Sequence, residues 1–424
     1  MIYLKQASKT PLSEDVREPV EAMLRELEAG GENTARAYAE RFDDYRGEIS
    51  LGAEEISAAA EQVPASVKED IDFAHKRVKR FAEAQRGCLH DLEYTEDGVT
   101  LGHRWVPVKT AGCYVPGGRY AHVASAIMSV TTAKVAGVET VVACTPGKGG
   151  AGVNPAVLYT LGLCGADYVL ALGGVQGVAA LAYGQFTGHK ADILVGPGNV
   201  YVAEAKRLLY GSVGIDVFAG PSEVAVIAEE SADVELVAVD LVAQLEHGPT
   251  SPAWLFTTSS PVAEKVASRV PELIAALPSP AREAAASAWE DYGEIILCES
   301  FEEVVEVSDR YAPEHLEVHA DEPRRYLDAL RSYGSLFLGE EVPVAYGDKV
   351  SGPNHILPTR YAAHYSSGLN VGKFMKTLTY QQMTPAASVK LGAVTARLSR
   401  LEGMEAHARS ADIRLERYAR SKSG

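Results

Sequence analysis

The sequence contains few cysteines, and their spacing matches no metal or redox motif. Five cysteines occur in 424 residues, and no two of them form a C-x-x-C pair. Cysteines scattered in this way favour neither a disulfide framework nor a cysteine-ligated zinc site, so we expect buried thiols. Any metal bound by this chain must then take its ligands from His, Asp, Glu or Gln side chains.

The chain also lacks an excess of positive charge and lacks long apolar runs. Its 40 Lys and Arg against 57 Asp and Glu give a formal net charge of -17, which disfavours nucleic acid and anionic membranes as partners because both require a basic surface. No apolar run approaches the roughly 18 to 20 residues that span a bilayer. The first residues lack the basic-then-apolar layout of a secretory signal, so we expect a cytoplasmic protein.

A glycine-rich dinucleotide fingerprint is missing as well. Gly173-Gly174 and Gly196-Pro197-Gly198 follow apolar runs, and such turns let a phosphate-bearing ligand approach the backbone near a helix N-terminus. Neither turn extends to G-x-G-x-x-G, and no acidic residue follows about 20 positions later. Taken alone, these turns are more often ordinary α/β connections than nucleotide contacts, and any dinucleotide site here must be atypical.

The sequence does contain a repeated strand–turn–helix pattern. A helical opening segment over residues 12–86, interrupted at Gly30-Gly31, precedes two series of apolar runs that end in turns. The first series lies at 138–144, 168–174 and 193–199, and the second at 222–228, 253–258 and 293–298. We therefore predict an α/β fold with two Rossmann-like, doubly wound lobes, a helical N-terminal segment and a mainly helical C-terminal tail.

Gln244 and His247 are candidate metal ligands. They lie three residues apart in a run with helical spacing, so both side chains can face one ion. Asp348 and one histidine of the carboxy-terminal region would complete a set suited to zinc; the candidates for that histidine are His355, His364 and His407. A cap or a core hydrogen bond is the commoner role of such a pair, and spacing alone leaves the choice open.

Glu314 and His315 supply adjacent acid/base groups in a Pro-Glu-His triplet. A positioned carboxylate and imidazole can transfer protons to and from a substrate. The alternative is an exposed pair in a loop.

Taken together, the motifs resemble the histidinol dehydrogenase family over residues 10 to 420. The motifs that carry the resemblance lie at 114–118, 173–176, 196–199, 219–223, 244–249, 312–316, 347–348 and 354–358, with Glu402 five residues before His407. The resemblance implies one Zn²⁺ per subunit, bound by Gln244, His247, Asp348 and His407. It further implies a homodimer with shared active sites, in which the tail that bears Glu402 and His407 completes the partner's site.

The resemblance also implies residue roles and a reaction. His315 would take the alcohol proton as hydride leaves for NAD, and Glu314 would deprotonate a water that converts the held aldehyde to the carboxylate with a second hydride transfer. The positions that match dinucleotide contacts in the family are Tyr114, Gln176 and Asn199. The positions on the substrate side are Ser222, His355 and Glu402.

With these roles the predicted domains are an N-terminal extension (1–10), a discontinuous first lobe with the metal and catalytic residues (11–113 and 222–367), a second lobe on the dinucleotide side (114–221) and the tail (368–424).

The chain departs from the family's usual small residues directly after residues 114–118. Arg119 and His122 place two potential cations near the expected cleft, and this stretch resembles a paralogous branch that includes sulfopropanediol dehydrogenase. An arginine fork suits an anionic sulfonate or carboxylate; an equally weighted alternative is that Arg119 binds cofactor phosphate or forms a surface ion pair.

Among small-molecule alcohols, we favour 2,3-dihydroxypropane-1-sulfonate, oxidised to sulfolactate, or a similar anionic polyol. The alternative substrate is L-histidinol, oxidised to L-histidine. A non-catalytic zinc-binding scaffold is disfavoured because all the residues expected for metal binding, proton transfer and tail contact are present: Gln244, His247, Glu314, His315, Asp348, Glu402 and His407.

Overall fold

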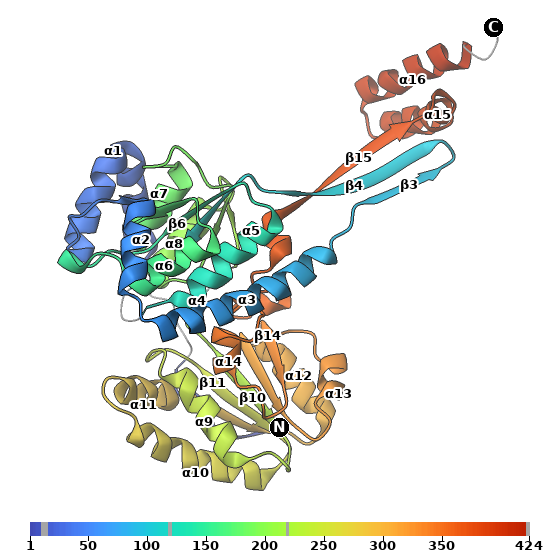
Figure 1. Ribbon diagram of the computed structural model, residues 1–424. Helices are drawn as coiled ribbons and strands as arrows, with labels where there is room; N and C mark the ends of the chain where they lie inside the picture. The colour runs from blue at the N-terminus through green and yellow to red at the C-terminus, as the bar shows by residue number, and fades with distance from the viewer. Residues whose placement is uncertain (10–15, 118–120, 218–219, 421–424) are drawn as a thin grey trace. The chain divides into compact units, whose positions relative to one another are not determined.

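The structure, a computed structural model, describes residues 1–9, 16–117, 121–217 and 220–420 (Figure 1). The chain forms two compact units. The first comprises Met1–Arg86 and Val108–Phe374, and the second comprises Gly87–Pro107 and Met375–Gly424. The first unit is described first.

One six-stranded sheet of the first unit has the order β1-β12-β11-β10-β13-β14, and its pairs are parallel except for β1 with β12. Its strands are β1 (Ile2–Lys5), β10 (Val224–Ala228), β11 (Ala253–Thr257), β12 (Glu294–Leu297), β13 (His315–His319) and β14 (Ser335–Leu338). The central strands β10 and β11 are buried along their whole length. Parallel strands covered on both faces read as continuous apolar runs, as this sequence predicts.

Helices cover both faces of this sheet. Val224 and Val226 of β10 face a core built with α9, α10 and α11, whereas Ala225 and Ile227 face a second core that includes α12. The helices of this half are α9 (Val234–Leu245), α10 (Ser260–Ala276), α11 (Ala281–Tyr292), α12 (Phe301–Tyr311), α13 (Arg324–Ala329) and α14 (Val344–Lys349). Alternate residues of one strand therefore belong to two cores, as a doubly wound sheet requires.

The other six-stranded sheet has the order β2-β7-β6-β5-β8-β9, with only β2 antiparallel to its neighbour. Its strands are β2 (Ser50–Leu51), β5 (Thr110–Tyr114), β6 (Thr140–Cys144), β7 (Tyr168–Leu170), β8 (Ile193–Val195) and β9 (Gly214–Ile215). Its later helices are α4 (Val123–Ala126), a π-helical turn (Ile127–Thr131), α5 (Thr132–Ala136), α6 (Pro155–Cys164), α7 (Gly174–Tyr183) and α8 (Val200–Leu209).

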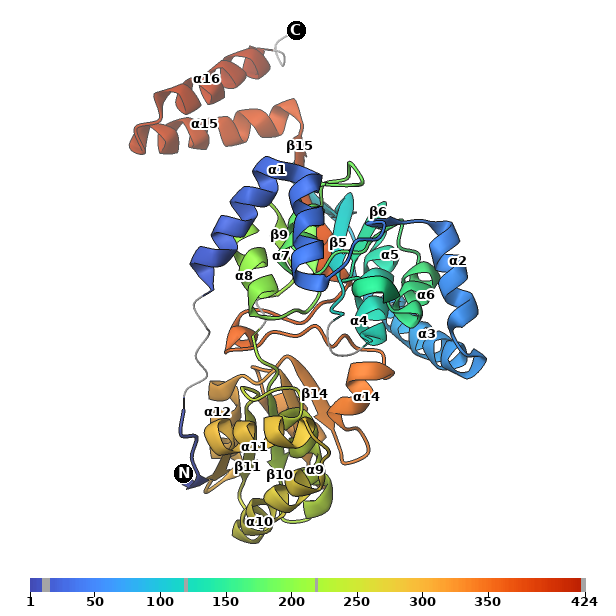
Figure 2. The ribbon, with the colours of Figure 1, turned by 90° about the vertical axis from the view of Figure 1, so that its left-hand side faces the viewer.

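The helical opening segment forms α1 (Arg17–Asp43), α2 (Ala53–Gln62) and α3 (Ala65–Gly87). A kink at Gly31, with φ 59° and ψ -142°, interrupts α1 where the sequence predicts a stop, because glycine tolerates positive φ. Helix α1 packs against α7 and α8, and α2 packs against α6 (Figure 2). The segment therefore joins the β5 sheet, which differs from the predicted grouping of 11–113 with 222–367.

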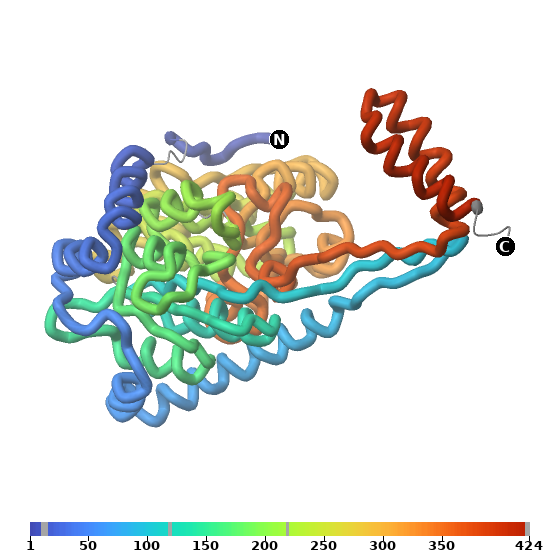
Figure 3. The backbone as a smooth tube through the Cα atoms, turned by 90° about the horizontal axis from the view of Figure 1, so that it is seen from above, coloured from blue at the N-terminus to red at the C-terminus, as the bar shows by residue number. Residues whose placement is uncertain are grey.

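The second unit is a three-stranded antiparallel sheet, in the order β15-β4-β3, followed by a helix pair. Figure 3 shows the long strands running side by side with the two helices at one end. The elements are β3 (Leu92–Glu96), β4 (Val99–Pro107), β15 (Met375–Met383), α15 (Pro385–Leu401) and α16 (Glu405–Arg420). Among the described residues, the buried cluster between the helices consists of three alanines, Ala396, Ala408 and Ala411, so the helix pair has only a small core of its own.

The predicted fold class is confirmed: the chain is α/β with parallel sheets and helical segments at both ends of the sequence. Cys113, Cys144, Cys164 and Cys298 are buried, whereas Cys88 is exposed, contrary to expectation. Among the described residues, no helix combines the length and apolarity needed to cross a membrane.

Candidate active site

Glu314 and His315 lie at the start of β13, on the amino-terminal edge of the first sheet. Helix α12 ends at Ala312, whose φ of 46° is left-handed, and this conformation at a helix end turns the chain sharply. The turn carries Pro313 and Glu314 to the point where β13 pairs with β10. Both side chains of the acid/base pair are buried, so the alternative of an exposed loop pair does not hold.

The imidazole of His315 has a defined tautomer. Its Nδ1 lies 2.9 Å from the backbone carbonyl oxygen of Glu223, and because a carbonyl oxygen only accepts, Nδ1 carries the hydrogen. Within the described part of the chain, Nε2 has no hydrogen-bond partner and lies 3.5 Å from Oδ1 of Asp348. Burial lowers the pKa of His315, but the charges of Glu314 and Asp348 outweigh it and raise the pKa to about 9. Because Nδ1 already carries a hydrogen, Nε2 is the ring atom that can accept a proton.

The carboxylate of Glu314 is held by two hydrogen bonds to one oxygen. Its Oε2 accepts from the Ser222 hydroxyl at 2.6 Å and from the backbone N–H of Glu223 at 2.9 Å. Burial raises the pKa of Glu314, and the neighbouring His315 and these two hydrogen bonds partly offset that rise. A carboxylate with raised proton affinity suits a general base near neutral pH.

Asp348, at the end of α14, carries a strongly stabilised negative charge. Burial acts to raise its pKa, but His315, whose Nε2 lies 3.5 Å from Oδ1, and the neighbouring His355 and His247 lower the pKa below its usual range. The carboxylate therefore remains ionised at any working pH and can serve as a cation ligand.

His355 links two segments that line the site. Its Nδ1 lies 3.0 Å from the backbone carbonyl oxygen of Asp348, and its Nε2 lies 2.9 Å from Oγ of Ser125. The carbonyl fixes the hydrogen on Nδ1, so Nε2 accepts from Ser125. Burial lowers the pKa of His355 to about 4, and the ring is neutral at physiological pH.

Gln244 and His247 occupy the carboxyl end of α9 and the residues just beyond it. Asp233 caps the start of this helix. The Gln244 side chain is 2% exposed, and its Nε2 has no partner among the described residues. The ring of His247 is accessible to solvent, yet the surrounding protein excludes enough water to lower its pKa, against the opposing charge of Asp348. Gln244 thus presents an unsatisfied buried amide, and His247 a neutral imidazole close to Asp348.

His122 belongs to the same region. Burial lowers its pKa, and the charges of Lys349 and His247 lower it further, so these three residues lie close enough to interact. The other predicted substrate cation, Arg119, lies outside the described residues.

The three predicted dinucleotide contacts lie at the carboxyl edge of the β5 sheet or in helices that start there. Tyr114 ends β5, and its hydroxyl accepts a hydrogen bond from the backbone N–H of Gly174 at 3.1 Å. Gln176 donates to Asp43 at 3.2 Å, and Asn199 caps the N-terminus of α8. This edge is where nucleotides bind in open α/β sheets.

Glu402 and His407 lie in the second unit, where Glu402 ends α15 and His407 lies in the first turns of α16. Both side chains are exposed. The predicted contribution of these residues to a partner's site stays a prediction.

Glu223 is a site residue that the sequence did not single out. Its backbone contacts both members of the acid/base pair, its Oε1 accepts from the backbone N–H of Arg360 at 3.0 Å, and its Oε2 has no partner among the described residues. Burial raises the pKa of Glu223 to about 8. Glu223 directly follows Ser222 and ends the motif at 219–223, and this position is the feature of the sequence that could have identified it as a site residue.

A cavity of about 90 Å³ lies next to the acid/base pair and is lined by residues that include His315, Asp348, Asn354 and His355. A larger cavity, of about 490 Å³, is lined by residues of α3, α5 and α6 and contains none of the predicted site residues. The chemistry-bearing groups therefore mark the smaller cavity as the candidate site.

Comparison with known proteins shows which family the chain resembles. Residues 6–415 match the family model of histidinol dehydrogenase. A histidinol dehydrogenase homolog of Pelagibacter ubique is 53% identical over 99% of both chains. A sulfopropanediol 3-dehydrogenase of Ruegeria pomeroyi is 54% identical, over 98% of this chain and 96% of that protein.

The fold is also that of a solved relative. The crystal structure of a histidinol dehydrogenase from Elizabethkingia anophelis superposes with a TM-score of 0.90 at 32% identity, covering 97% of this chain and 94% of that one.

Proposed function

The chain belongs to the histidinol dehydrogenase family and is therefore a dehydrogenase, and we propose that it oxidises a small primary alcohol to the carboxylate in two hydride transfers to NAD. The observation that carries this proposal is the arrangement of His315, which lines the cavity, has its Nδ1 hydrogen engaged with Glu223 and has no hydrogen-bond partner at Nε2 among the described residues. A buried imidazole with one nitrogen fixed and the other open is arranged for general base catalysis.

In the first step, Nε2 of His315 takes the hydroxyl proton of the alcohol while the carbon-bound hydrogen leaves as hydride to the first NAD. The products are an aldehyde, NADH and an imidazolium ion. The carboxylates of Glu314 and Asp348, within 3.5 Å of the two ring nitrogens, stabilise that positive charge. Proton transfer by a positioned group contributes roughly 10² to 10⁴ in rate.

In the second step, Glu314 accepts a proton from the water that adds to the aldehyde. The resulting gem-diolate anion loses its carbon-bound hydrogen as hydride to a second NAD, which gives the carboxylic acid. The hydroxyl of Ser222 and the backbone of Glu223 orient the carboxylate for this role through Oε2.

We further propose that Gln244, His247 and Asp348, with His407 of the partner subunit, bind one Zn²⁺. The donor types support the proposal, because an ionised carboxylate, a neutral imidazole and the amide oxygen of a buried glutamine suit a divalent ion of borderline softness. When bound, the ion would supply positive charge that orients and polarises the substrate oxygen.

NAD is proposed to bind at the carboxyl edge of the β5 sheet. Gly196, with a φ of 119°, leaves no room for a side chain, because a Cβ there would lie 1.9 Å from the carbonyl oxygen of Tyr114. The helices α7 and α8 begin at this edge of the sheet, and the positive end of a helix dipole favours phosphate. This geometry supports nucleotide binding without the usual glycine fingerprint.

A homodimer with shared sites is proposed from the surface of the second unit. Large apolar side chains are exposed over its strands and helices, namely Leu92, Tyr94, Leu378, Tyr380, Met383, Leu391, Val394, Leu398, Leu401, Met404 and Ile413. Exposed large apolar side chains in this number are typical of an interface rather than of a solvated tail. A second copy of the chain is the partner that the family resemblance indicates.

For the substrate, we favour 2,3-dihydroxypropane-1-sulfonate or a similar anionic polyol over L-histidinol. Lys349 adds positive charge near His122 and His247, and a sulfonate needs a cationic partner. The 54% identity with a sulfopropanediol 3-dehydrogenase, against 42% with a histidinol dehydrogenase of Gluconobacter oxydans, supports the same choice.

The test is the amount of NADH formed per substrate molecule consumed. Zinc-loaded protein would be offered L-histidinol and each enantiomer of the sulfonate in parallel, with chelator-treated protein as the control. Two NADH per sulfonate molecule and none from histidinol is the expected result. Two NADH from histidinol alone would support the alternative substrate, and no turnover of either would contradict both.

A further inference from the structure

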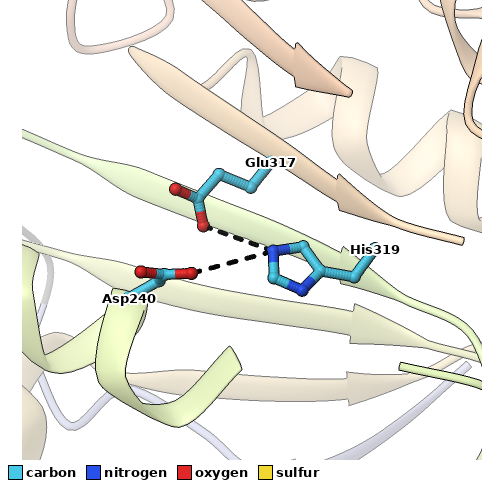
Figure 4. Close-up of side chains that lie close together, drawn as sticks. All are labelled: Asp240, Glu317 and His319. Atoms are coloured by element: carbon cyan, nitrogen blue, oxygen red, sulfur yellow. Dashed lines mark ion pairs between the residues drawn. The ribbon is translucent and has the colours of Figure 1, made fainter. Parts of the chain in front are cut away.

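A second group of metal-ligand side chains lies between α9 and β13 (Figure 4). It consists of Asp240, Glu317 and His319, whose donor atoms all lie within 4.8 Å of one another, and it shares no residue with the proposed zinc site. Glu317 and His319 are two residues apart on β13 and therefore face the same side of the sheet. They pair with Val226 and Ala228 of β10, which face the core that α9 covers.

The distances within this group are too long for hydrogen bonds and close to those between ligands of one ion. Nε2 of His319 lies 3.8 Å from Oδ2 of Asp240 and 3.7 Å from Oε2 of Glu317, and Figure 4 shows both carboxylates directed at this nitrogen. Ligand atoms bound tetrahedrally at 2.0 to 2.2 Å from zinc are about 3.4 Å apart. The two distances from Nε2 of His319 therefore exceed that separation by only a few tenths of an ångström.

The buried atoms of the group lack partners. Glu317 is 0% exposed; its Oε1 accepts from the backbone N–H of Val344 at 2.6 Å, but its Oε2 has no hydrogen-bond partner among the described residues. His319 is 1% exposed, and its Nδ1 is likewise without a hydrogen-bond partner in the described part of the chain. An unsatisfied buried carboxylate oxygen is costly, so an uncounted ligand or proton must compensate it.

The charges of the group call for a divalent cation. Two buried carboxylates face one imidazole, and even a protonated His319 would leave one negative charge uncompensated. A divalent ion, together with a neutral His319, brings the net charge of the group to zero. Oε1 of Glu340 lies 4.0 Å from the other ring nitrogen of His319, on the side where a carboxylate orients a metal-ligating histidine.

We propose that Asp240, Glu317 and His319 bind a divalent transition-metal ion, such as Zn²⁺ or Mn²⁺, at a structural site. One nitrogen and two carboxylate oxygens are donors that these ions accept. Asp240 lies one helical turn before Gln244, and Glu317 follows His315 on the same strand. An ion here would hold together the two elements that carry the candidate active site, whatever reaction that site performs.

The competing explanation is a proton shared between Asp240 and Glu317. Burial and the adjacent charge of Glu317 raise the pKa of Asp240 to about 7, so a protonated Asp240 would also relieve the repulsion. The two explanations differ in whether the group takes up metal.

The experiment is a titration of chelator-treated, full-length protein with Co²⁺, followed by visible absorption and by elemental analysis after gel filtration. The background is the His247→Ala/Asp348→Asn variant, which removes two ligands of the proposed zinc site. We expect this background to retain one tightly bound equivalent per subunit, and Glu317→Gln or His319→Gln added to it to remove that equivalent. Glu294→Gln, which alters a buried carboxylate of β12 outside the group, is the matched control and should retain it.

Two further readouts keep the test decisive. Co²⁺ should raise the unfolding temperature of the background variant and leave that of the variant with Glu317→Gln unchanged. Glu340→Gln should weaken Co²⁺ binding about 10- to 100-fold, as loss of an orienting partner does. Absence of any bound equivalent in the folded background variant, or its retention in both Glu317→Gln and His319→Gln, would overturn the proposal in favour of the shared proton. Either outcome leaves the alcohol oxidation at the other site untouched.

Discussion

The backbone carbonyl oxygen of Glu223 lies 2.9 Å from Nδ1 of His315, and the backbone N–H of the same residue lies 2.9 Å from Oε2 of Glu314. One peptide segment at the start of β10 therefore orients both groups of the acid/base pair. Because the carbonyl fixes the histidine tautomer, the reactive nitrogen is defined before any substrate binds.

We predict that alcohol oxidation rises with pH through the titration of His315. The base must be neutral to accept the alcohol proton, and the charges of Glu314 and Asp348 raise its pKa to about 9. Activity in the first half-reaction should therefore increase up to about pH 9 and then level off. Glu314→Gln removes a charge that raises this pKa, so the rising limb should move to lower pH in single-turnover measurements of alcohol oxidation. A limb that stays in place would mean that another group is the base.

Substitutions should separate the two half-reactions. His315→Ala should slow oxidation of the alcohol by roughly 10² to 10⁴, because the proton acceptor is lost. Glu314→Gln should slow oxidation of the aldehyde more than that of the alcohol, because water activation is impaired. The two rates can be measured with the alcohol and the aldehyde offered separately, and Glu294→Gln controls for the loss of a buried carboxylate elsewhere. Equal effects on both rates would contradict this division of roles.

Mixing two inactive variants tests the shared site. If each site combines Glu314 of one subunit with His407 of the other, a dimer of His407→Ala with Glu314→Gln protein contains one intact site. After complete subunit exchange at equal amounts, about a quarter of wild-type activity should return. Mass spectrometry of differently tagged subunits would report the exchange, and mixed dimers without activity would argue against the shared arrangement.

A buried ion pair beside the proposed nucleotide edge should contribute strongly to stability. Nζ of Lys206 pairs with Asp216 and donates to the carbonyl oxygen of Gly196 at 2.9 Å, while the N–H of Gly196 donates to Asp216 at 2.7 Å. Lys206→Met leaves Asp216 buried without its cation, so the free energy of unfolding should fall by about 3 to 5 kcal/mol. Denaturant unfolding measures the loss.

The exposed pair of Arg207 and Glu204 offers the control for that measurement. Arg207→Met should change the free energy of unfolding by less than about 1 kcal/mol, because exposed pairs contribute little. A similar loss in both variants would indicate that the buried pair adds nothing beyond side-chain packing.

The strands of both sheets could be predicted where the sequence is continuously apolar. Residues 224–228 and 253–257 are buried strands. Their short length and continuous apolar composition are local features of the sequence, and these features are enough to predict a buried strand. Strand β15 was missed, since its residues after Met375 are exposed and show no buried face. The placement of the opening segment on the β5 sheet depends on pairing between Ser50 and Leu170, which no local pattern specifies.

The same limit applies to the candidate site. Glu314 and His315 are adjacent in sequence, so their cooperation could be inferred. The hydrogen bond between Ser125 and His355 spans 230 positions, and the group formed by Asp240 with Glu317 and His319 depends on the packing of α9 over β13. Such partners are defined by tertiary packing rather than by spacing.

The hold of Glu223 on the acid/base pair has an evolutionary consequence. Both contacts come from main-chain atoms, which every amino acid at position 223 except proline would provide. Mutation of side chains around the cleft can therefore alter which alcohol is accepted without disturbing the atoms that orient the proton acceptors. Enzymes that descend from one ancestral dehydrogenase could therefore differ in substrate specificity while the main-chain contacts at position 223 keep the same orientation of the acid/base pair.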